Sequence, residues 1–171
     1  MNDPTLYIFS GLPASGKTTL SQLMARRLCI SYVRVDTIEQ ALRDLYSVDV
    51  QDEGYALSYR IASDILRVGG SVVVDSCNPI EITRRKWEQV ALEAGARYVN
   101  IEVICSNENE HHKRVETRLS TITGLNLPTW SEVQNREYHI WMAERIVVDT
   151  SGISESECIN ELISKLSENY A

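Results

Sequence analysis

The sequence predicts an α/β fold in which helices cover both faces of a five-stranded, mostly parallel sheet. Short apolar runs alternate with longer segments that have helical periodicity, which is typical of such sheets. The chain has 171 residues, enough for one hydrophobic core, and it contains no Pro/Gly/Ser-rich linker and no internal repeat. We therefore expect a single domain over residues 1–171.

In the first part of the chain, strand and helix patterns follow each other closely. The expected strands are residues 6–9, 32–35 and 71–74, and the expected helices are residues 19–28, 37–45, 53–68 and 79–94. Pro79 suits the first turn of its helix, for which Asn78 is the expected N-cap. The basic triplet at residues 84–86 lies within this helix and is expected to form a solvated face.

The second part continues the alternation. The expected strands are residues 98–104 and 146–148, and the expected helices are residues 108–121, 131–142 and a terminal helix after residue 154. Asn107 with Glu110, and Ser154 with Glu157, have the spacing of helix-capping pairs. We expect residues 107–143 to form a helical lid over the ends of the strands.

One motif dominates the sequence. Residues 11–18 read G-L-P-A-S-G-K-T, a complete match to G-x-x-x-x-G-K-[ST], between an expected strand and an expected helix. Glycine at positions 11 and 16 lets the backbone curl so that N–H groups point at phosphate oxygens, and the helix N-terminus adds its positive dipole. The expected nucleotide-binding residues are Gly11, Leu12, Pro13, Ala14, Ser15, Gly16, Lys17, Thr18 and Thr19.

Three aspartates, Asp36, Asp75 and Asp149, stand where expected strands end, at the edge of the sheet that carries this loop. Asp75 closes a short apolar strand and is expected to hold Mg²⁺ together with the Thr18 hydroxyl, while Lys17 reaches the β- and γ-phosphates. Asp36 has the position of a carboxylate that accepts the proton of an acceptor hydroxyl. Alternatively, Asp36 caps the helix at residues 37–45, and the two roles are compatible.

Two arginines complete the expected catalytic set. Arg114 and Arg118 are four residues apart in an expected helix, so they share a face and can reach from a lid over the phosphates. Alternatively, they are solvated and paired locally with Glu110 and Glu116. The neighbouring histidines at 111 and 112 point about 100° apart on a helix, which argues against a metal pair.

Composition limits the classes of partner. The formal net charge is −7, so no overall basic footprint for a long polynucleotide is present. The four cysteines are scattered without a C-x-x-C pair, which predicts neither a zinc site nor a disulfide framework. No apolar run approaches the roughly 18 residues of a membrane span, and no secretory signal is visible. These features fit a cytoplasmic enzyme without a membrane partner.

Taken together, residues 11–19, 34–36 and 74–78 and the pair Arg114 and Arg118 resemble small P-loop kinases of the nucleoside-monophosphate-kinase-like fold. Within that fold they are most similar to the group of chloramphenicol phosphotransferase and the kinase domain of bacteriophage polynucleotide kinase. The resemblance implies an ATP donor, Mg²⁺ and transfer to a hydroxyl, with Asp36 as the base. It also implies that the loop at residues 149–152 lies near the adenine.

One position departs from that group. Polynucleotide kinases place an arginine three residues after the aspartate, and here the residue is Glu39, which disfavours nucleic-acid ends. The sequence therefore predicts an ATP- and Mg²⁺-dependent kinase that acts on a hydroxyl of a small molecule. A polynucleotide 5′-kinase and a non-kinase ATPase or switch remain alternatives. No pattern in the sequence specifies the acceptor or the oligomeric state.

Overall fold

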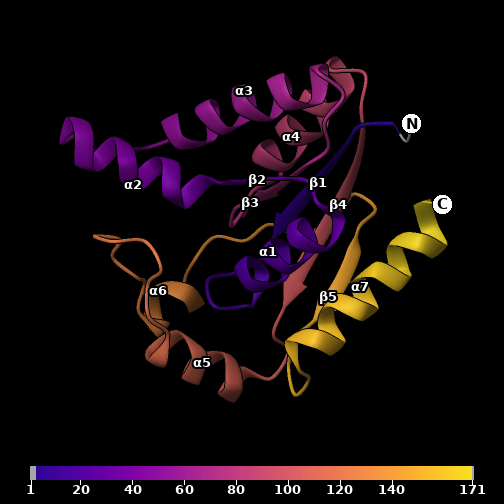
Figure 1. Cartoon of the computed structure of the whole chain (residues 1–171). Helices are drawn as coiled ribbons and strands as arrows, with labels where there is room; N and C mark the ends of the chain where they lie inside the picture. The colour runs from indigo at the N-terminus through magenta and orange to yellow at the C-terminus, as the bar shows by residue number, and fades with distance from the viewer. Residues whose placement is uncertain (1–2, 171) are drawn as a thin grey trace.

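The computed structural model describes residues 3–170, which contain a sheet of five parallel strands in the order β2-β3-β1-β4-β5 (Figure 1). The strands are β1 (Thr5–Ser10), β2 (Ser31–Arg34), β3 (Val72–Asp75), β4 (Arg97–Ile104) and β5 (Ile146–Asp149). The predicted α/β class and the five-stranded sheet are confirmed. Because all strands are parallel, their carboxyl ends meet at one edge.

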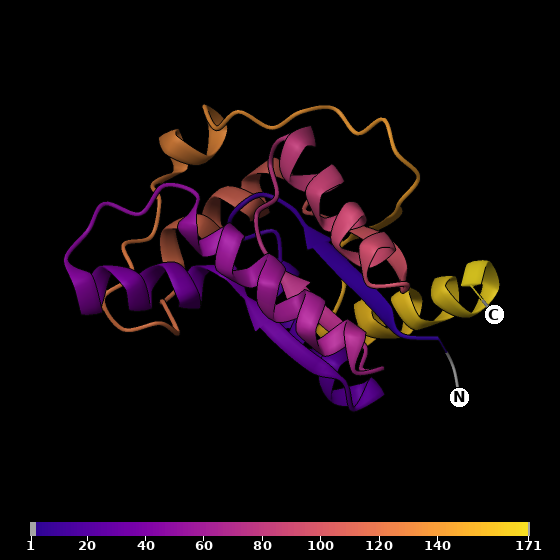
Figure 2. The same ribbon diagram turned by 90° about the horizontal axis from the view of Figure 1, so that it is seen from above.

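The alternation of side chains along β1 divides the core into two layers. Leu6 and Ile8 are buried on one face, where α3 (Glu53–Arg67) and α4 (Glu81–Glu93) pack. Phe9 is buried on the other face, against α1 (Lys17–Leu28) and α7 (Glu155–Tyr170). Figures 1 and 2 show these helix pairs on opposite sides of the sheet. A strand that is covered on both faces has a nearly continuous apolar sequence, as β1 and β3 do.

The remaining helices, α2 (Val35–Tyr46), α5 (Glu108–Thr117) and α6 (Trp130–Gln134), lie beyond the edge of the sheet where the strands end (Figure 1). Two expected helix starts are confirmed. The Asn107 side chain accepts a hydrogen bond from the Glu110 backbone N–H at 3.0 Å. The Ser154 hydroxyl likewise accepts from the Glu157 N–H, and the Glu157 carboxylate accepts from the Ser154 N–H in return.

Two expected helices in the lid are wrong in extent. The helix expected at residues 131–142 is the short α6, and no helix or strand covers residues 135–145, which we call the strap. The helix expected at 108–121 ends at Thr117, and Arg118 is extended, with φ −67° and ψ 148°. The strap is held by contacts with distant residues and not by helical hydrogen bonds. The Trp141 ring packs against Arg84 on α4, and the His139 N–H donates to the Pro79 carbonyl oxygen.

The start of α4 also differs from the expectation. The helix begins at Glu81 with Ile80 at the N-cap position, so Asn78 is not the cap. Asn78 instead adopts a left-handed conformation with φ +50°, and its buried side-chain amide donates to the Ser10 hydroxyl at 3.0 Å. The sequence analysis assigned the Asn78 side chain to the N-cap of this helix. It instead forms a hydrogen bond that joins the end of β1 to the loop after β3.

Among residues 3–170, no helix combines the length and the apolar character that a membrane span requires.

The aromatic side chain of Trp87 provides a test of the core. Trp87 on α4 is fully buried and makes an edge contact with Tyr59 at 4.4 Å between ring centroids. We expect Trp87→Ala to lower the free energy of unfolding by about 3–5 kcal/mol, because it leaves a cavity. Leu92→Ala on the same helix, at a side chain that is 64% exposed, should change it by less than about 0.5 kcal/mol. Chemical denaturation of both variants measures the difference, and equal effects would contradict this packing.

Candidate active site

The predicted phosphate loop lies between β1 and α1. Gly11 has φ +149°, and a Cβ there would overlap the carbonyl oxygen of Val103 on β4. Gly16 has φ +95° and occupies the N-cap position of α1, where no side chain caps the helix. The first backbone N–H groups of a helix lack intrahelical acceptors, so these remain available for an anion.

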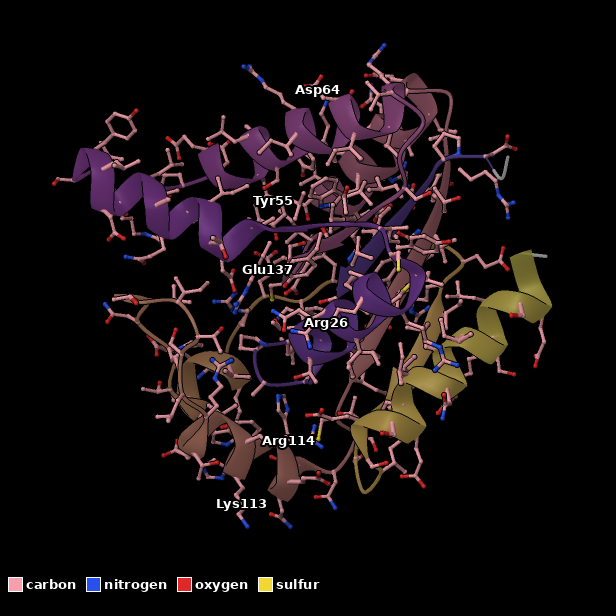
Figure 3. All side chains as sticks on the ribbon, in the orientation of Figure 1. Arg26, Tyr55, Asp64, Lys113, Arg114 and Glu137 are labelled. Atoms are coloured by element: carbon pink, nitrogen blue, oxygen red, sulfur yellow. The ribbon has the colours of Figure 1, made fainter. Side chains whose placement is uncertain are left out.

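Two distant segments hold the loop in this shape. The Nε2 atom of buried His111 on α5 lies 2.8 Å from the carbonyl oxygen of Pro13. From the loop after β5, the Thr150 hydroxyl donates to the carbonyl oxygen of Ser15 at 2.8 Å. Arg114 in turn donates to the Thr150 hydroxyl at 2.7 Å and to its carbonyl oxygen at 2.8 Å. Arg114 (labelled in Figure 3) also donates to the Glu110 carboxylate at 2.6 Å, so the local pair offered as an alternative is present beside the contacts through which Arg114 supports the loop.

A cavity of about 570 Å³ lies along the phosphate loop. Its walls come from the loop itself, α1, α2, the chain after α5, the strap and the segment after β5. Five of the six residues predicted for catalysis and metal binding line it: Lys17, Thr18, Asp36, Arg114 and Arg118. The sixth, Asp75, is almost wholly buried behind the wall.

Lys17 is buried at the start of α1 and lines the cavity. Among the described residues no carboxylate forms a salt bridge with its ammonium group. A buried charge without a protein counter-ion is costly, so this arrangement suits an anionic ligand. The phosphate groups of a nucleotide meet this requirement.

Asp75 ends β3, as the sequence predicted. Its Oδ2 atom accepts a hydrogen bond from the Tyr32 hydroxyl at 2.8 Å and lies 3.8 Å from Arg34 Nε. Burial, followed by the charge of Asp75, raises the pKa of Tyr32, so the phenol stays a donor. The other oxygen, Oδ1, is buried and has no hydrogen-bond partner among the described residues. A buried oxygen left free in this way fits a site that Mg²⁺ or its water completes.

Asp36 is not at the end of a strand, because β2 ends at Arg34 and α2 begins at Val35. The backbone of Arg34 occupies the N-cap position, so the alternative in which Asp36 caps this helix is wrong. The Asp36 carboxylate instead stands in the first helical turn with its side chain 40% exposed, 4.0 Å from Arg34 Nη2. Asp36 lines the cavity.

The two predicted arginines are not on one helical face. Arg114 lies in the last turn of α5, whereas Arg118 lies just beyond the helix, at its C-cap position. Both still line the cavity, because the chain turns around its mouth after Thr117. The Nε atom of Arg118 is buried without a hydrogen-bond partner among the described residues. Burial lowers the pKa of Arg118, and the charge of Asp36 opposes this effect.

Three further arginines line the cavity that the sequence analysis did not select: Arg34, Arg43 and Arg136. Arg43 pairs with Glu39 across one turn of α2, with Nη2 and Oε2 3.4 Å apart. Burial, followed by the nearby charge of Asp36, raises the pKa of Glu39. An arginine four residues after a glutamate on a helix is a visible local signal, but nothing in the sequence shows that the pair faces a cavity.

The strap is attached by a residue that the sequence analysis assigned to solvent. Arg84 is buried, and its guanidinium donates to the carbonyl oxygens of Asn78, Pro79 and His139, each at 3.0 Å. It also lies over the Trp141 ring, 4.1 Å from the centroid. Arg84 therefore ties the strap to the loop after β3 and is not part of a solvated face.

Asp149, the third strand-end aspartate, does not line the cavity. Its Oδ1 atom accepts hydrogen bonds from the Ser106 N–H at 3.1 Å and the Ser151 N–H at 3.0 Å. Burial by itself raises the pKa of Asp149, but the hydrogen bonds from the two serines outweigh it and lower the pKa well below the ordinary value. Asp149 thus holds the loop from which Thr150 reaches the phosphate loop.

Comparison with known proteins places the chain in a family. The AAA domain family matches residues 6–126, which include the phosphate loop, Asp36, Asp75, Arg114 and Arg118. The chain belongs to this AAA domain family. No curated protein sequence matches the chain significantly.

Solved structures share the fold of this AAA domain over almost its whole length. A proposed kinase from Chloroflexus aurantiacus is 20% identical, with a TM-score of 0.75 and 98% of both chains covered. A gluconokinase from Sinorhizobium meliloti is 17% identical, with a TM-score of 0.70 and 98% and 94% covered. The APS kinase CysC from Mycobacterium tuberculosis, in complex with AMPPNP and APS, is 18% identical, with a TM-score of 0.70 and 98% and 99% covered.

These likenesses show that the AAA domain has the fold of small P-loop kinases. The narrower resemblance to chloramphenicol phosphotransferase and polynucleotide kinase stays a prediction.

Gly11 offers a direct test of the phosphate loop in this AAA domain. We expect Gly11→Ala to weaken nucleotide binding by roughly tenfold or more, about 1.4 kcal/mol, because the new Cβ displaces the loop from Val103. Gly95→Ala is the control, since Gly95 also has a positive φ but its Cβ would meet open space. Calorimetric titration with Mg²⁺ and AMPPNP measures both affinities. Equal affinities in the two variants would count against the close packing.

The hydrogen bonds to Asp149 predict a pH dependence. Since its pKa is lowered in the folded state, the carboxylate contributes stability above its unfolded pKa of about 3.9, and this contribution is lost as the pH falls toward the folded value. We expect Asp149→Asn to be less stable than wild type at pH 7, with the gap in unfolding free energy shrinking below about pH 4. Urea denaturation at pH 7 and pH 3 tests this, and a gap that is the same at both would refute it.

Proposed function

We propose that this protein is an ATP- and Mg²⁺-dependent kinase that transfers the γ-phosphoryl group to a hydroxyl of a small molecule. The observation that carries the proposal is that the phosphate loop, Lys17 and Asp36 line the same cavity. A phosphate cradle alone binds a nucleotide. A carboxylate across the same cavity adds a group that can receive a proton from an acceptor.

On the donor side, the backbone N–H groups of the loop and the Lys17 ammonium bind the phosphates. Thr18 and Asp75 would hold Mg²⁺ through hydroxyl and carboxylate oxygens, which this ion prefers, and the ion would supply positive charge against the phosphates. The nucleotide base is assigned to the end of the cavity formed by the segment after β5, where Ile153 and Cys158 line the wall. This assignment follows the resemblance, which implies an adenine near residues 149–152.

On the acceptor side, Asp36 orients the hydroxyl and accepts its proton as the oxygen bonds to the γ-phosphorus. The bond between the γ-phosphorus and the β–γ bridging oxygen breaks in the same step, and the electron pair leaves with ADP. Arg114 and Arg118 lie on the lid side of this space and stabilise charge on the moving phosphoryl group. Arg114 is already oriented by its hydrogen bonds to Thr150.

The structural neighbours support a small acceptor. Two of them are named for activity on small molecules, as a gluconokinase and an APS kinase. Glu39 in the cavity wall, at the position where polynucleotide kinases place an arginine, disfavours a polynucleotide 5′-kinase. An ATPase or nucleotide-dependent switch is the second candidate, because membership of the AAA domain family specifies no acceptor.

A product screen separates these candidates. Incubation of the purified protein with ATP, Mg²⁺ and a metabolite extract should yield a new phosphorylated compound detectable by mass spectrometry. Transfer of label to a short oligonucleotide would identify the polynucleotide kinase, and ATP consumption without any phosphorylated acceptor would identify the ATPase.

With the acceptor in hand, Asp36→Asn tests the base. We expect kcat to fall by about 10²–10⁴-fold, because the amide cannot accept the hydroxyl proton, while the affinity for AMPPNP stays within a few-fold. Asp64→Asn is the matched control, at an exposed aspartate on α3 (labelled in Figure 3) that does not line the cavity. Steady-state kinetics and calorimetry measure the two effects, and a kcat within a few-fold of wild type would remove Asp36 from this role.

A further inference from the structure

The pairing of β2 with β3 places two side chains beside the Asp75 carboxylate. Tyr32 is opposite Val73 in the parallel register, and Arg34 is opposite Asp75. Because side chains two residues apart on a strand share a face, Tyr32 and Arg34 lie on the face of the sheet that carries Asp75. Val73 and Tyr32 belong to the core layer of α1. The Asp75 side chain is therefore on the side of the sheet that is covered by the helix following the phosphate loop.

The two oxygens of the Asp75 carboxylate have different surroundings. Oδ2 accepts a hydrogen bond from the Tyr32 hydroxyl at 2.8 Å. Oδ1 is buried and has no hydrogen-bond partner among residues 3–170. The two oxygens are chemically equivalent, and a half-turn of the carboxylate exchanges them. The Tyr32 hydroxyl thus determines that one oxygen is occupied by the protein while the other stays free.

Arg34 is the alternative partner of this carboxylate. Its Nε atom lies 3.8 Å from Asp75 Oδ2, too far for a hydrogen bond, and is itself buried without a hydrogen-bond partner among the described residues. Its Nη1 atom donates to the hydroxyl of Thr121 in the lid at 2.9 Å. An arginine that bonded directly to Asp75 would occupy the carboxylate with charge-assisted hydrogen bonds. The hydrogen bonds from Tyr32 to Asp75 and from Arg34 to Thr121 leave that pair unmade.

The Tyr32 hydroxyl is a donor of fixed orientation. The Tyr32 ring packs against the core layer of α1, and its hydroxyl has a further hydrogen bond with the Gln22 side chain on that helix. Burial, followed by the charge of Asp75, raises the pKa of Tyr32, so the phenol keeps its proton at neutral pH. A phenol has one proton to donate, and it goes to Asp75, so Gln22 is the donor to the phenol oxygen. The hydroxyl is therefore held from two sides.

We propose that Tyr32 is a positioning residue for the magnesium site, and that its hydroxyl holds Asp75 Oδ2 so that Oδ1 remains available to Mg²⁺ or to a water on the ion. Partners of this kind fix the orientation of a ligating carboxylate, and their loss typically weakens metal binding by about 10- to 100-fold. Tyr32 acts only through Asp75, since it does not line the cavity. This inference rests on the proposed kinase function and adds a residue to its metal site.

The gain in nucleotide affinity that Mg²⁺ provides tests the inference without an acceptor and without turnover. Calorimetry measures the affinity for AMPPNP once in EDTA and once with enough Mg²⁺ to saturate the nucleotide, and the ratio of the two affinities is the gain. Tyr32→Phe removes only the hydroxyl, so its affinity for AMPPNP in EDTA should stay within twofold of wild type. We expect its gain from Mg²⁺ to fall by about tenfold or more, because Asp75 loses its orientation.

Tyr7→Phe is the matched control. Tyr7 lies on β1, packs against the same core layer and has a hydrogen bond with the Thr5 side chain, but it does not line the cavity. The gain from Mg²⁺ in Tyr7→Phe should equal that of wild type. Equal gains in wild type, Tyr7→Phe and Tyr32→Phe would overturn the positioning role.

A double variant separates positioning from a general effect on the fold. Asp75→Asn removes the proposed ligand, and most of the gain from Mg²⁺ should disappear with it. Tyr32→Phe added to Asp75→Asn should lower the gain no further, because the hydroxyl acts through the carboxylate alone. The same fold-loss from Tyr32→Phe in both backgrounds would show that Tyr32 acts elsewhere, and the inference would be wrong.

The wild-type measurements separate this inference from the proposed function. If AMPPNP binds in neither condition, the kinase function is contradicted and the positioning role is lost with it. If AMPPNP binds but Mg²⁺ adds no affinity, the metal site and the positioning role are both contradicted. A wild-type gain that Tyr32→Phe retains in full would overturn the positioning role and leave the kinase function intact.

Discussion

The close contact between the phosphate loop and β4 is the constraint on which the rest of the site depends. Gly11 leaves no room for a side chain beside the Val103 carbonyl, and this approach sets where the loop turns into α1. Because α1 starts without a side-chain cap, its N-terminal N–H groups remain free for an anion. His111 and Thr150 then hold the loop from two other segments through its backbone carbonyls. The same backbone conformation therefore packs the loop against β4 and leaves N–H groups free for a phosphate.

Charge is distributed in a way that total composition hides. The chain is acidic overall, but arginines from β2, α2, the end of α5 and the strap meet at one cavity. Arg34 lies near both Asp75 and Asp36. The proposed magnesium ligand and the proposed base thus share one guanidinium. A change at Arg34 would affect both sides of the proposed reaction.

The patterns that the sequence predicted correctly are local ones. The strand, glycine loop and helix at residues 5–28 follow from neighbouring residues, and so do the caps at Asn107 and Ser154 and the aspartate that ends β3. The wrong predictions concern segments whose conformation depends on contacts with residues far away in the sequence. The strap is not helical because Tyr138 and Trp141 pack on Arg84, more than fifty residues away in the chain.

The sequence by itself determined the parallel α/β sheet, the phosphate loop and most of the residues that face it, because hydrophobic periodicity and the glycine motif act over a few neighbouring residues. Only the tertiary structure decided that Arg118 leaves its helix, that His111 supports the loop and that Arg43 and Arg136 reach the same cavity as Asp36. Those contacts join segments up to about a hundred residues apart. No short pattern specifies them, since each depends on how the lid and the strap pack against the sheet.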